Sequence, residues 1–309
     1  MRFLRGLIVT LVVLGAAYGI LALIASPRPT HAYERYLQTG VSVLAHAGGN
    51  LLWPDNTMVA FSGASAMGAD VLELDVHRVA DGAFVVIHDD TVDRTTDGSG
   101  AVAQSGMLDL RRLAAGYRWT TAGPSTATDG VFPYRGTGVT LPTLTEVLGA
   151  FPDMAVNVEI KQNDPDVADA LCLLIRDQGA AERVMVGSFH GGALAQFRRA
   201  CPEVATSASQ NEVIVFLALE KLRLSAVLTP QYEALQVPIS QYGIPIVTQH
   251  FVDAAAARGV DVHVWTVNDE ATMRDLVGLG VNGLITDRPD RALRVLGRPV
   301  AGVPEFVQP

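Results

Sequence analysis

The stretch Val71-Leu72-Glu73-Leu74-Asp75-Val76 indicates the fold class of this chain of 309 residues. Side chains alternate between the two faces of a β-strand, so Glu73 and Asp75 share one face and the apolar residues between them share the other. Val156-Asn157-Val158-Glu159-Ile160-Lys161 repeats the same alternation. Because buried parallel strands are normally apolar on both faces, two strands with a polar face predict a sheet that gathers polar side chains.

Outward from these two stretches, short β-rich runs alternate with helical patterns over the rest of the chain. This alternation predicts parallel βα units, and about eight such units in roughly 250 residues match a (β/α)8 TIM barrel. A doubly wound open sheet is the alternative, but it usually has a glycine-rich dinucleotide turn after its first strand. That turn here is His46-Ala47-Gly48-Gly49, which does not match. The expected strands begin at Val41, Asp70, Val156, Arg183, Val204, either Ala234 or Ile244, Asp261 and Gly283.

Two features follow the second expected strand. Asp81-Gly82 lies between two β-rich runs and predicts a two-residue hairpin turn. The segment Asp93–Leu141 is too long for an ordinary loop and is rich in Gly, Thr and Asp. We expect it to be an insertion over one end of the barrel, because long structured insertions are often functional lids.

The N-terminal region contains a strongly apolar segment. Leu7–Ala25 has no charged residue, and Arg2 and Arg5 precede it. Its length suits one transmembrane helix, and a cleaved signal peptide is the competing interpretation. The two preceding arginines favour a cytoplasmic N-terminus and an extracytoplasmic domain, whereas Arg28 and Arg35 just beyond the segment oppose that orientation.

The expected organisation is an anchor over residues 1–25, a linker over 26–40, a catalytic barrel over 41–297 and a C-terminal tail over 298–309. The formal net charge of −9 argues against nucleic acid as a partner, because neutralising phosphates requires clustered Lys and Arg. An anionic small substrate stays compatible with this charge, since a bound cation can reverse the local sign.

The chain has two cysteines, Cys172 and Cys201. Two are too few for a disulfide framework and show no metal-ligand spacing. We expect two structural thiols, with a bridge between them as the alternative if the domain is exported.

The candidate metal ligands are Glu73, Asp75 and Glu159. Burying like charges together is costly, and hard cations such as Mg²⁺ or Ca²⁺ prefer carboxylate oxygens. Three carboxylates on two barrel strands therefore predict a divalent cation site, and a solvent-exposed strand face is the structural alternative. Lys161 is a candidate for binding a phosphate oxygen as a point charge.

Two histidines follow expected strands, and active sites of such barrels lie at the carboxyl ends of strands. His46 follows the first strand, and His88 ends the hairpin strand. A histidine pair can serve as general base and general acid. Trp265 alternates with Val264 and Thr266, so it faces either the barrel mouth or the core.

Several ordered motifs between about Val41 and Leu296 together resemble the glycerophosphodiester phosphodiesterase family. His46 to Gly49 followed by Pro54-Asp55-Asn56-Thr57 resembles its first signature, and Glu73-Leu74-Asp75-Val76 resembles its metal motif. The remaining similar segments are His88-Asp89 with Asp93-Arg94-Thr95-Thr96, Glu159-Ile160-Lys161, Val264-Trp265-Thr266-Val267-Asn268 and Thr286-Asp287-Arg288-Pro289.

The resemblance implies a (β/α)8 barrel that hydrolyses glycerophosphodiesters to glycerol 3-phosphate and an alcohol. It implies that Glu73, Asp75 and Glu159 bind Mg²⁺ or Ca²⁺, and that His46 and His88 are the catalytic acid–base pair. In the family mechanism the glycerol 2-hydroxyl attacks phosphorus and water resolves the cyclic phosphate. The remaining positions that match family site residues are Lys161 as a phosphate contact and Trp265 as a wall of the substrate pocket.

One position departs from the family pattern. The family has an arginine after its first histidine, where this chain has Ala47. The loss either lowers activity or is compensated by another cation, for which Arg118, Arg135 and Lys161 are the candidates. The apolar N-terminal segment and the insertion favour the alternative function, a lysophospholipase D that releases lysophosphatidic acid. A non-catalytic lipid- or metal-binding barrel is a third interpretation, and only Ala47 supports it.

Overall fold

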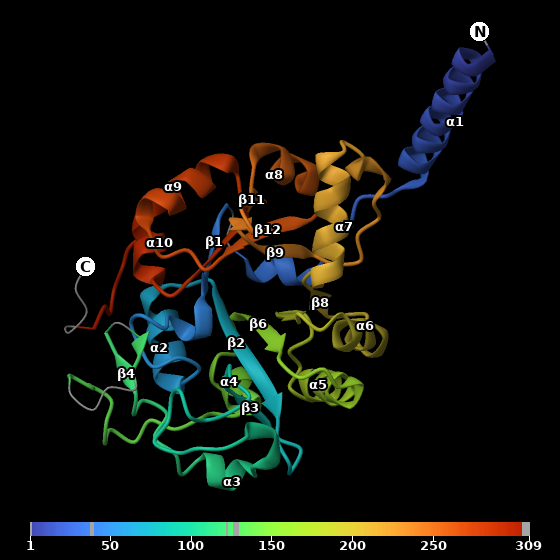
Figure 1. Ribbon diagram of the computed structural model, residues 1–309. Coiled ribbons are helices and arrows are strands. Elements are labelled where there is room, and N and C mark those ends of the chain that lie inside the picture. The colour runs from blue at the N-terminus through green and yellow to red at the C-terminus, as the bar shows by residue number, and fades with distance from the viewer. Residues whose placement is uncertain (1, 38–39, 122, 126–129, 305–309) are drawn as a thin grey trace.

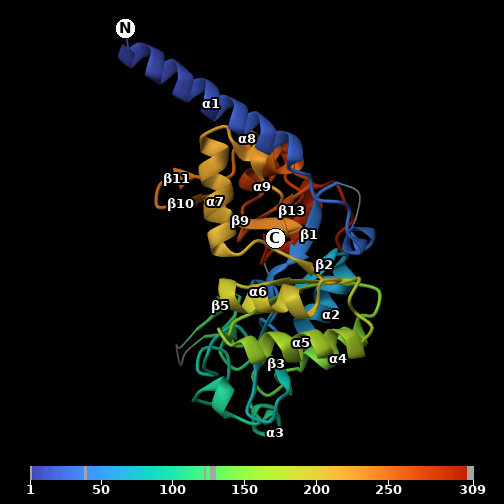
Figure 2. The same cartoon turned by 90° about the vertical axis from the view of Figure 1, so that its right-hand side faces the viewer.

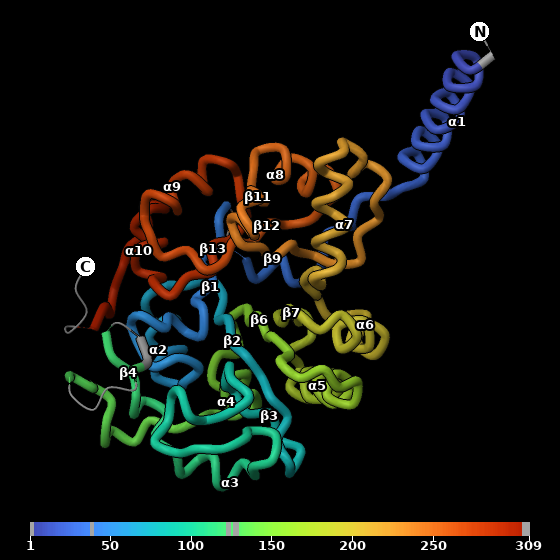
Figure 3. Tube along the Cα trace, in the orientation of Figure 1, coloured from blue at the N-terminus to red at the C-terminus, as the bar shows by residue number. Residues whose placement is uncertain are grey.

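The computed structural model describes residues 2–37, 40–121, 123–125 and 130–304, and Figure 3 traces their path. Eight parallel strands form the predicted (β/α)8 barrel, in the spatial order β8-β7-β6-β2-β1-β13-β12-β9. A parallel bridge between Ser207 and Ala234 joins the two ends of this sheet. The barrel strands are β1 (Ser42–Ala45), β2 (Val71–Arg78), β6 (Ala155–Ile160), β7 (Val184–Gly187), β8 (Ala205–Thr206), β9 (Ala234–Pro238), β12 (Asp261–Trp265) and β13 (Gly283–Thr286).

Helices surround the barrel, as Figure 1 shows. Several begin with a side-chain cap where the sequence supplies one. Thr143 and Ser209 form capping boxes with Glu146 and Glu212, respectively. The helices that follow barrel strands or the insertion are α2 (Met58–Met67), α4 (Leu144–Ala150), α5 (Pro165–Asp177), α6 (Gly191–Ala200), α7 (Gln210–Lys221), α8 (Gln249–Ala256), α9 (Glu270–Leu279) and α10 (Pro289–Val295).

The barrel interior changes from apolar to polar along its axis. Near the amino ends of the strands, interior side chains such as Val71 and Ala155 form a buried cluster with Tyr33. Two residues further along the same strands lie Glu73 and Asn157, which are paired in register. Every second residue of a strand faces inward, so these four side chains all lie inside the barrel. The apolar layer lies toward the amino ends of the strands, and the polar layer lies toward their carboxyl ends.

The Asp81-Gly82 hairpin is confirmed, because β2 pairs antiparallel with β3 (Phe84–Val86). The choice between Ala234 and Ile244 is also decided. β9 is the barrel strand, whereas β11 (Ile244–Pro245) pairs only with β10 (Ser240–Gln241) in a separate hairpin. Both runs are short and apolar, so their local patterns do not distinguish them.

The insertion lies beside the barrel. It contains α3 (Met107–Leu110) and the short strands β4 (Trp119–Thr120) and β5 (Gly123–Pro124), and its apolar side chains pack under β3 in a second cluster. Residues 122 and 126–129 lie outside the described residues. Among the others in the insertion, none lines the main cavity. The insertion reaches the barrel end, because Trp119 Nε1 donates to the carbonyl of Asn50 and Arg94 pairs with Asp55 in the loop after β1. Its described residues do not, however, form a lid over the cavity.

The predicted linker packs against the amino end of the barrel rather than hanging free. The short helix η1 (Ala32–Tyr36) places Tyr33 under the barrel, where it is 1% exposed. Arg28 forms an ion pair with Glu233, and its backbone N–H donates to the carbonyl of Arg258. Residues 38 and 39 of the linker and residues 305–309 of the tail lie outside the described residues.

Before the linker, α1 (Arg2–Ile24) projects away from the barrel, as Figures 1 and 2 show. Its segment Phe3–Ile24 has 22 residues and a mean hydropathy of 2.7. At 1.5 Å per residue this helix is about 33 Å long, close to the roughly 30 Å thickness of a bilayer core. The helix is long and apolar enough to span a membrane, and a signal sequence has the same character.

Cys172 and Cys201 form a disulfide, so the expectation of two free thiols is wrong. The bridge joins α5 to the residue that follows α6, and both cysteines are buried. Packing of these two adjacent helices brings the sulfur atoms together, which a pattern of two isolated cysteines does not reveal.

Replacing Cys172 and Cys201 together by serine should destabilise the domain. The bridge closes a loop of 29 residues, which corresponds to roughly 3–4 kcal/mol by loop-closure entropy. We expect a lower melting temperature in calorimetry, with reduced wild-type protein falling to the same value. A melting temperature that stays unchanged in both would show that the bridge does not stabilise the fold.

Candidate active site

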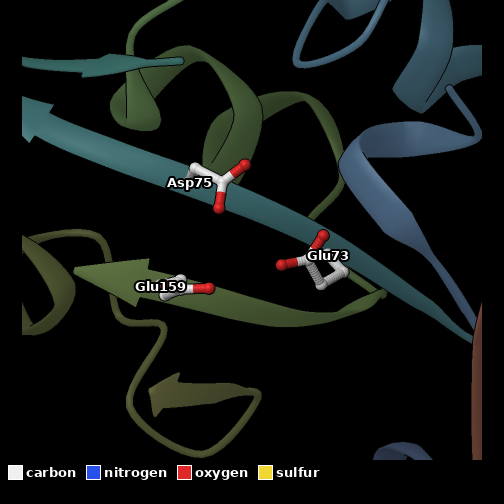
Figure 4. A group of neighbouring side chains, drawn as sticks. All are labelled: Glu73, Asp75 and Glu159. Carbon is white, nitrogen blue, oxygen red and sulfur yellow. The ribbon is translucent and has the colours of Figure 1, made fainter. Parts of the chain in front are cut away.

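The three predicted carboxylates meet at the polar layer of the barrel. Glu73 and Asp75 lie on β2, and Glu159 lies on the neighbouring β6, where it is paired in register with Asp75. One carboxylate oxygen from each side chain lies within 4.8 Å of the other two. Figure 4 shows the three side chains directed toward a common space between the strands.

These carboxylates lie in a buried environment. Glu73 is 4% exposed and Asp75 is 1% exposed. Burial, with the charge of Asp75, raises the pKa of Glu73 to about 8, and burial also raises the pKa of Glu159. Burial opposes ionisation of Asp75 as well, but the ammonium group of Lys161 outweighs it and lowers the pKa of Asp75. Burial therefore opposes ionisation of Glu73 and Glu159, and a bound cation would offset this cost by favouring their charged forms.

This donor set fits a hard divalent cation. Three carboxylates converge from two adjacent strands, and such cations bind carboxylate oxygens preferentially. Neighbouring groups also fix the ligands. The Ala47 N–H donates to Glu73 Oε2 at 2.8 Å, and Asn56 Nδ2 donates to Asp75 Oδ2 at 2.9 Å. Such supporting contacts are typical of metal sites.

Lys161 lies between the carboxylates and the cavity. Its Nζ is 2.9 Å from Asp75 Oδ1 and 2.9 Å from Glu159 Oε1. Burial disfavours the ammonium, but the two carboxylates outweigh it and raise the pKa of Lys161. The side chain is therefore a fixed positive charge at the cavity wall, where it can reach an anionic ligand.

His46 is oriented by an aspartate from the last βα loop. It follows β1, and its Nδ1 lies 2.6 Å from Asp287 Oδ1, which comes just after β13. Burial opposes its protonation, but the hydrogen bond to Asp287 and the charge of Glu73 outweigh it and raise the pKa of His46 to about 10. Since an ionised carboxylate only accepts, Nδ1 donates to Asp287 and Nε2 is left for a ligand.

His88 is oriented in the same way from the other side. Its Nδ1 lies 2.8 Å from Asp89 Oδ1, and Arg94 Nε donates to Asp89 Oδ2 at 2.7 Å. A second nitrogen of Arg94 lies 3.0 Å from Asp55. Each histidine thus has a carboxylate on Nδ1, the arrangement by which proteins fix the tautomer and orientation of a functional imidazole.

One cavity of about 620 Å³ joins these groups, within the usual range of about 300–1,000 Å³ for small-molecule sites. Its walls include every predicted site residue except Asp75, which lies behind the wall. Those wall residues are His46, Glu73, His88, Glu159, Lys161 and Trp265.

The cavity has a polar end and an apolar end. The apolar end is built by Trp265, which packs edge-to-face on Phe189 with ring centroids 5.9 Å apart, together with α7 and the β10–β11 hairpin. The apolar side chains that line it are Phe189, Val213, Ile214, Leu217, Ile244, Ile246 and Trp265. Trp265 therefore lines the cavity at the barrel mouth, and it also packs against the apolar cluster of the barrel interior.

Of the cations considered as substitutes for an arginine at position 47, only Lys161 lines the cavity among the described residues. Arg118 Nε donates to the carbonyl of Thr96. Arg135 donates to the carbonyl of Tyr117 and stacks on its ring. The side chain of Ala47 is itself buried at 3% exposure.

Several supporting residues were not selected from the sequence, namely Asp287, Asp89, Arg94, Asn56 and Asn268. Asn268 Nδ2 donates to Asp287 Oδ2 at 2.8 Å, so it holds the partner of His46. A usable signal exists, because all five lie within the segments that resemble the family motifs, and Asp287 also directly follows β13. The pairing of His46 with Asp287, which lie 241 residues apart in the sequence, is visible only in the fold.

Known proteins resemble this chain over most of the barrel. Residues 46–291 match the model of the glycerophosphoryl diester phosphodiesterase family. A glycerophosphodiester phosphodiesterase of Bacillus altitudinis is 31% identical over 82% of this chain and 97% of that protein. A lysophospholipase D of Rattus norvegicus is 24% identical over 84% of this chain and 86% of that protein.

Among solved structures, a glycerophosphodiester phosphodiesterase of Agrobacterium tumefaciens superposes with a TM-score of 0.64 at 25% identity. The match covers 82% of this chain and 99% of that one. The match in sequence and the match in fold both extend over nearly the whole barrel. The chain therefore belongs to the glycerophosphoryl diester phosphodiesterase family and is a phosphoric diester hydrolase.

Proposed function

We propose that this enzyme hydrolyses glycerophosphodiesters to glycerol 3-phosphate and an alcohol, with a divalent cation and the histidine pair. One observation carries the proposal. A carboxylate cluster suited to a cation and two histidines, each oriented through Nδ1 by an aspartate, border the same cavity. Phosphodiester hydrolysis requires both neutralised phosphate charge and paired proton transfer.

Glu73, Asp75 and Glu159 would hold the cation, with Mg²⁺ and Ca²⁺ as the candidates for a purely carboxylate donor set. When bound, the cation would supply Lewis-acid polarisation of a phosphoryl oxygen. Asn56 and the backbone N–H of Ala47 keep two of the ligands in place.

The histidines would carry the protons. Nε2 of one ring accepts the proton of the glycerol 2-hydroxyl as that oxygen attacks phosphorus, and Nε2 of the other donates a proton to the leaving alcohol oxygen. Water then opens the cyclic phosphate to glycerol 3-phosphate, with the two proton transfers in reverse. Because Asp287 and Asp89 occupy the Nδ1 positions, each ring presents the same nitrogen to the substrate. Lys161 would contact a phosphate oxygen, and Trp265 would form a wall beside the glycerol or the leaving group.

The test is choline release from glycerophosphocholine by the purified full-length protein. We expect turnover with Mg²⁺ or Ca²⁺ and its loss in EDTA, with recovery when the metal is restored. Turnover that is indifferent to EDTA would contradict the metal-dependent proposal. Metal binding without turnover of any glycerophosphodiester would instead favour the non-catalytic barrel.

A lysophospholipase D activity is the second candidate, and the apolar end of the cavity favours it. Phe189, Ile214 and Ile244 lie where an acyl chain attached to the glycerol would extend, and the rat relative is a lysophospholipase D. Comparing kcat/KM for glycerophosphocholine and lysophosphatidylcholine tests this candidate. A strong preference for the compound without an acyl chain would count against it.

Replacing Lys161 with glutamine should separate substrate binding from metal binding. The substitution removes a charged contact to phosphate, typically worth about 1.5–3 kcal/mol, so kcat/KM should fall roughly 10- to 150-fold. Metal affinity, measured by calorimetry with the metal alone, should stay equal or increase, because the ammonium no longer competes for Asp75 and Glu159. Weaker metal binding with unchanged kcat/KM would assign Lys161 to the metal cluster instead.

We also propose that α1 anchors the enzyme in a membrane with the barrel on the extracytoplasmic side. The helix is of spanning length, and the disulfide between Cys172 and Cys201 suits an oxidising compartment. Mass determination of the mature protein distinguishes the anchor from a cleaved signal, because cleavage removes the first 25 or so residues.

A further inference from the structure

The outward face of α7 is apolar, which is unusual for a helix on the outside of a barrel. Ile214, Ala218 and Leu222 are spaced by four residues, so they lie along one line of the helix. Val215 lies beside them. Ile214 is 56% exposed, Val215 is 51% exposed and Leu222 is 66% exposed, and Ala218 is also exposed.

This face connects the N-terminal helix to the cavity. At the carboxyl end of α7, Tyr18 Oη of α1 donates to the carbonyl of Arg223 at 3.4 Å. The end of α1 also packs against the short helix η4 (Ser225–Val227). At the other end of α7, Ile214 lines the cavity.

The β10–β11 hairpin continues the apolar surface at the cavity mouth. Its tip residue Tyr242 is 94% exposed and Ile244 is 54% exposed, and both line the cavity. Residues 234–249 contain no charged side chain. An uncharged hairpin with an exposed tyrosine suits a lipid–water interface, where aromatic rings with a polar atom gather.

The orientation of α1 agrees with this surface. In Figure 2, the β10–β11 hairpin and the free end of α1 both project to the left of the barrel. A bilayer that contains α1 therefore lies on the side of the hairpin and α7. Lys221 borders the apolar line on α7 and can extend its charged end to lipid head groups.

We propose that an apolar band, formed by Ile214, Val215, Ala218, Leu222, Tyr242 and Ile244, lies in the interface of the bilayer that holds α1. The cavity then opens at the membrane surface, so an amphiphilic phosphodiester enters with its polar end toward Glu73 and its apolar end toward the lipid. This inference rests on the proposed anchor but not on the proposed reaction.

The test places a reporter on single residues of the full-length protein in phosphatidylcholine vesicles. Both native cysteines are in the disulfide, so an introduced cysteine is the single thiol that an environment-sensitive dye can label. The test positions are Val215→Cys, Leu222→Cys and Tyr242→Cys. Leu173→Cys is the control, because Leu173 is 60% exposed on α5, which Figure 2 shows away from α1.

Quenchers attached to the lipid chains should reduce the emission at the three test positions at least threefold more than at the control. A second experiment measures quenching of the dye at position 242 after Val215 and Leu222 are both replaced by glutamate. The excess quenching at position 242 should then be mostly lost, whereas Leu173→Glu should leave it unchanged. Release of choline from glycerophosphocholine should stay within about twofold in the double variant that keeps Tyr242, because neither Val215 nor Leu222 lines the cavity.

Equal quenching at test and control positions would overturn the proposal. Emission shifted to shorter wavelengths without lipid quenching would also overturn it, in favour of a protein partner or a second copy covering the band. Failure to float with the vesicles would overturn both the band and the anchor. Choline release measured on the same samples reports separately on the proposed reaction.

Discussion

Replacing His46 with alanine should lower kcat for glycerophosphocholine by about 10²- to 10⁴-fold, the usual contribution of a general acid or base. The ring lies at the cavity wall with Nδ1 held by Asp287, so Nε2 is the atom that the substrate would meet. Metal affinity should change by less than about threefold, because no carboxylate of the cluster is removed. Stopped or continuous choline assays and calorimetry with the metal alone measure the two quantities.

The matched control is His250→Ala, a histidine on α8 that faces Glu220 and does not line the cavity. Its kcat should equal that of the native enzyme. An unchanged rate in His46→Ala would remove this residue from the proposed mechanism. A loss of metal binding in the same variant would mean that the histidine acts through the carboxylate cluster.

Replacing Glu73 with glutamine should abolish metal-dependent turnover and weaken metal binding at least about 100-fold. Loss of a direct carboxylate ligand exceeds the 10- to 100-fold effect typical of an outer-shell partner. Glutamine keeps the size of the side chain and an oxygen that can accept from the Ala47 N–H. The fold should therefore survive, and the variant isolates the charge.

Thermal unfolding provides a readout that does not depend on activity. In native protein, metal at 100 times its Kd should stabilise the fold by about 2.7 kcal/mol and raise Tm. At the same metal concentration, a 100-fold weaker Kd leaves Glu73→Gln with about 0.4 kcal/mol of this stabilisation, so nearly all of the rise in Tm should be lost. Without metal the variant should be more stable than native protein, because one of three clustered buried carboxylates is gone. Glu270→Gln, on the surface of α9, removes the same formal charge and serves as the control. A metal-dependent rise that persists in Glu73→Gln would exclude Glu73 as a ligand.

The barrel and the shared position of the three candidate carboxylates could be predicted because they depend on local patterns. Glu73, Asp75 and Glu159 alternate with apolar residues, and alternation alone assigns them to one face of their strands. The register that pairs Asp75 with Glu159 then brings the carboxylates together. His46 follows the parallel strand β1, and parallel strands in a barrel end at the same rim. His88 follows β3, which runs antiparallel to β2 and so returns the chain along the strand that carries Glu73 and Asp75.

Other features depend on contacts between distant segments, and their local sequence carries no sign of them. Cys172 and Cys201 meet because α5 packs on α6. The run that begins at Ala234, and not the run at Ile244, forms the barrel strand because it pairs with β12. The insertion packs on β3 through its own apolar cluster rather than over the cavity, and nothing in its composition specifies which surface it covers.

The sequence by itself therefore determined the (β/α)8 barrel, the apolar N-terminal segment and the polar residues at the strand ends, since periodicity and position along a strand are local properties. The tertiary structure decided the partners of those residues. Asp287 on His46, Asp89 and Arg94 on His88, and Lys161 between two carboxylates arise when the strands close into a barrel. It also decided that an apolar face of α7 runs from the end of α1 to the cavity mouth, because that alignment depends on how separate helices pack.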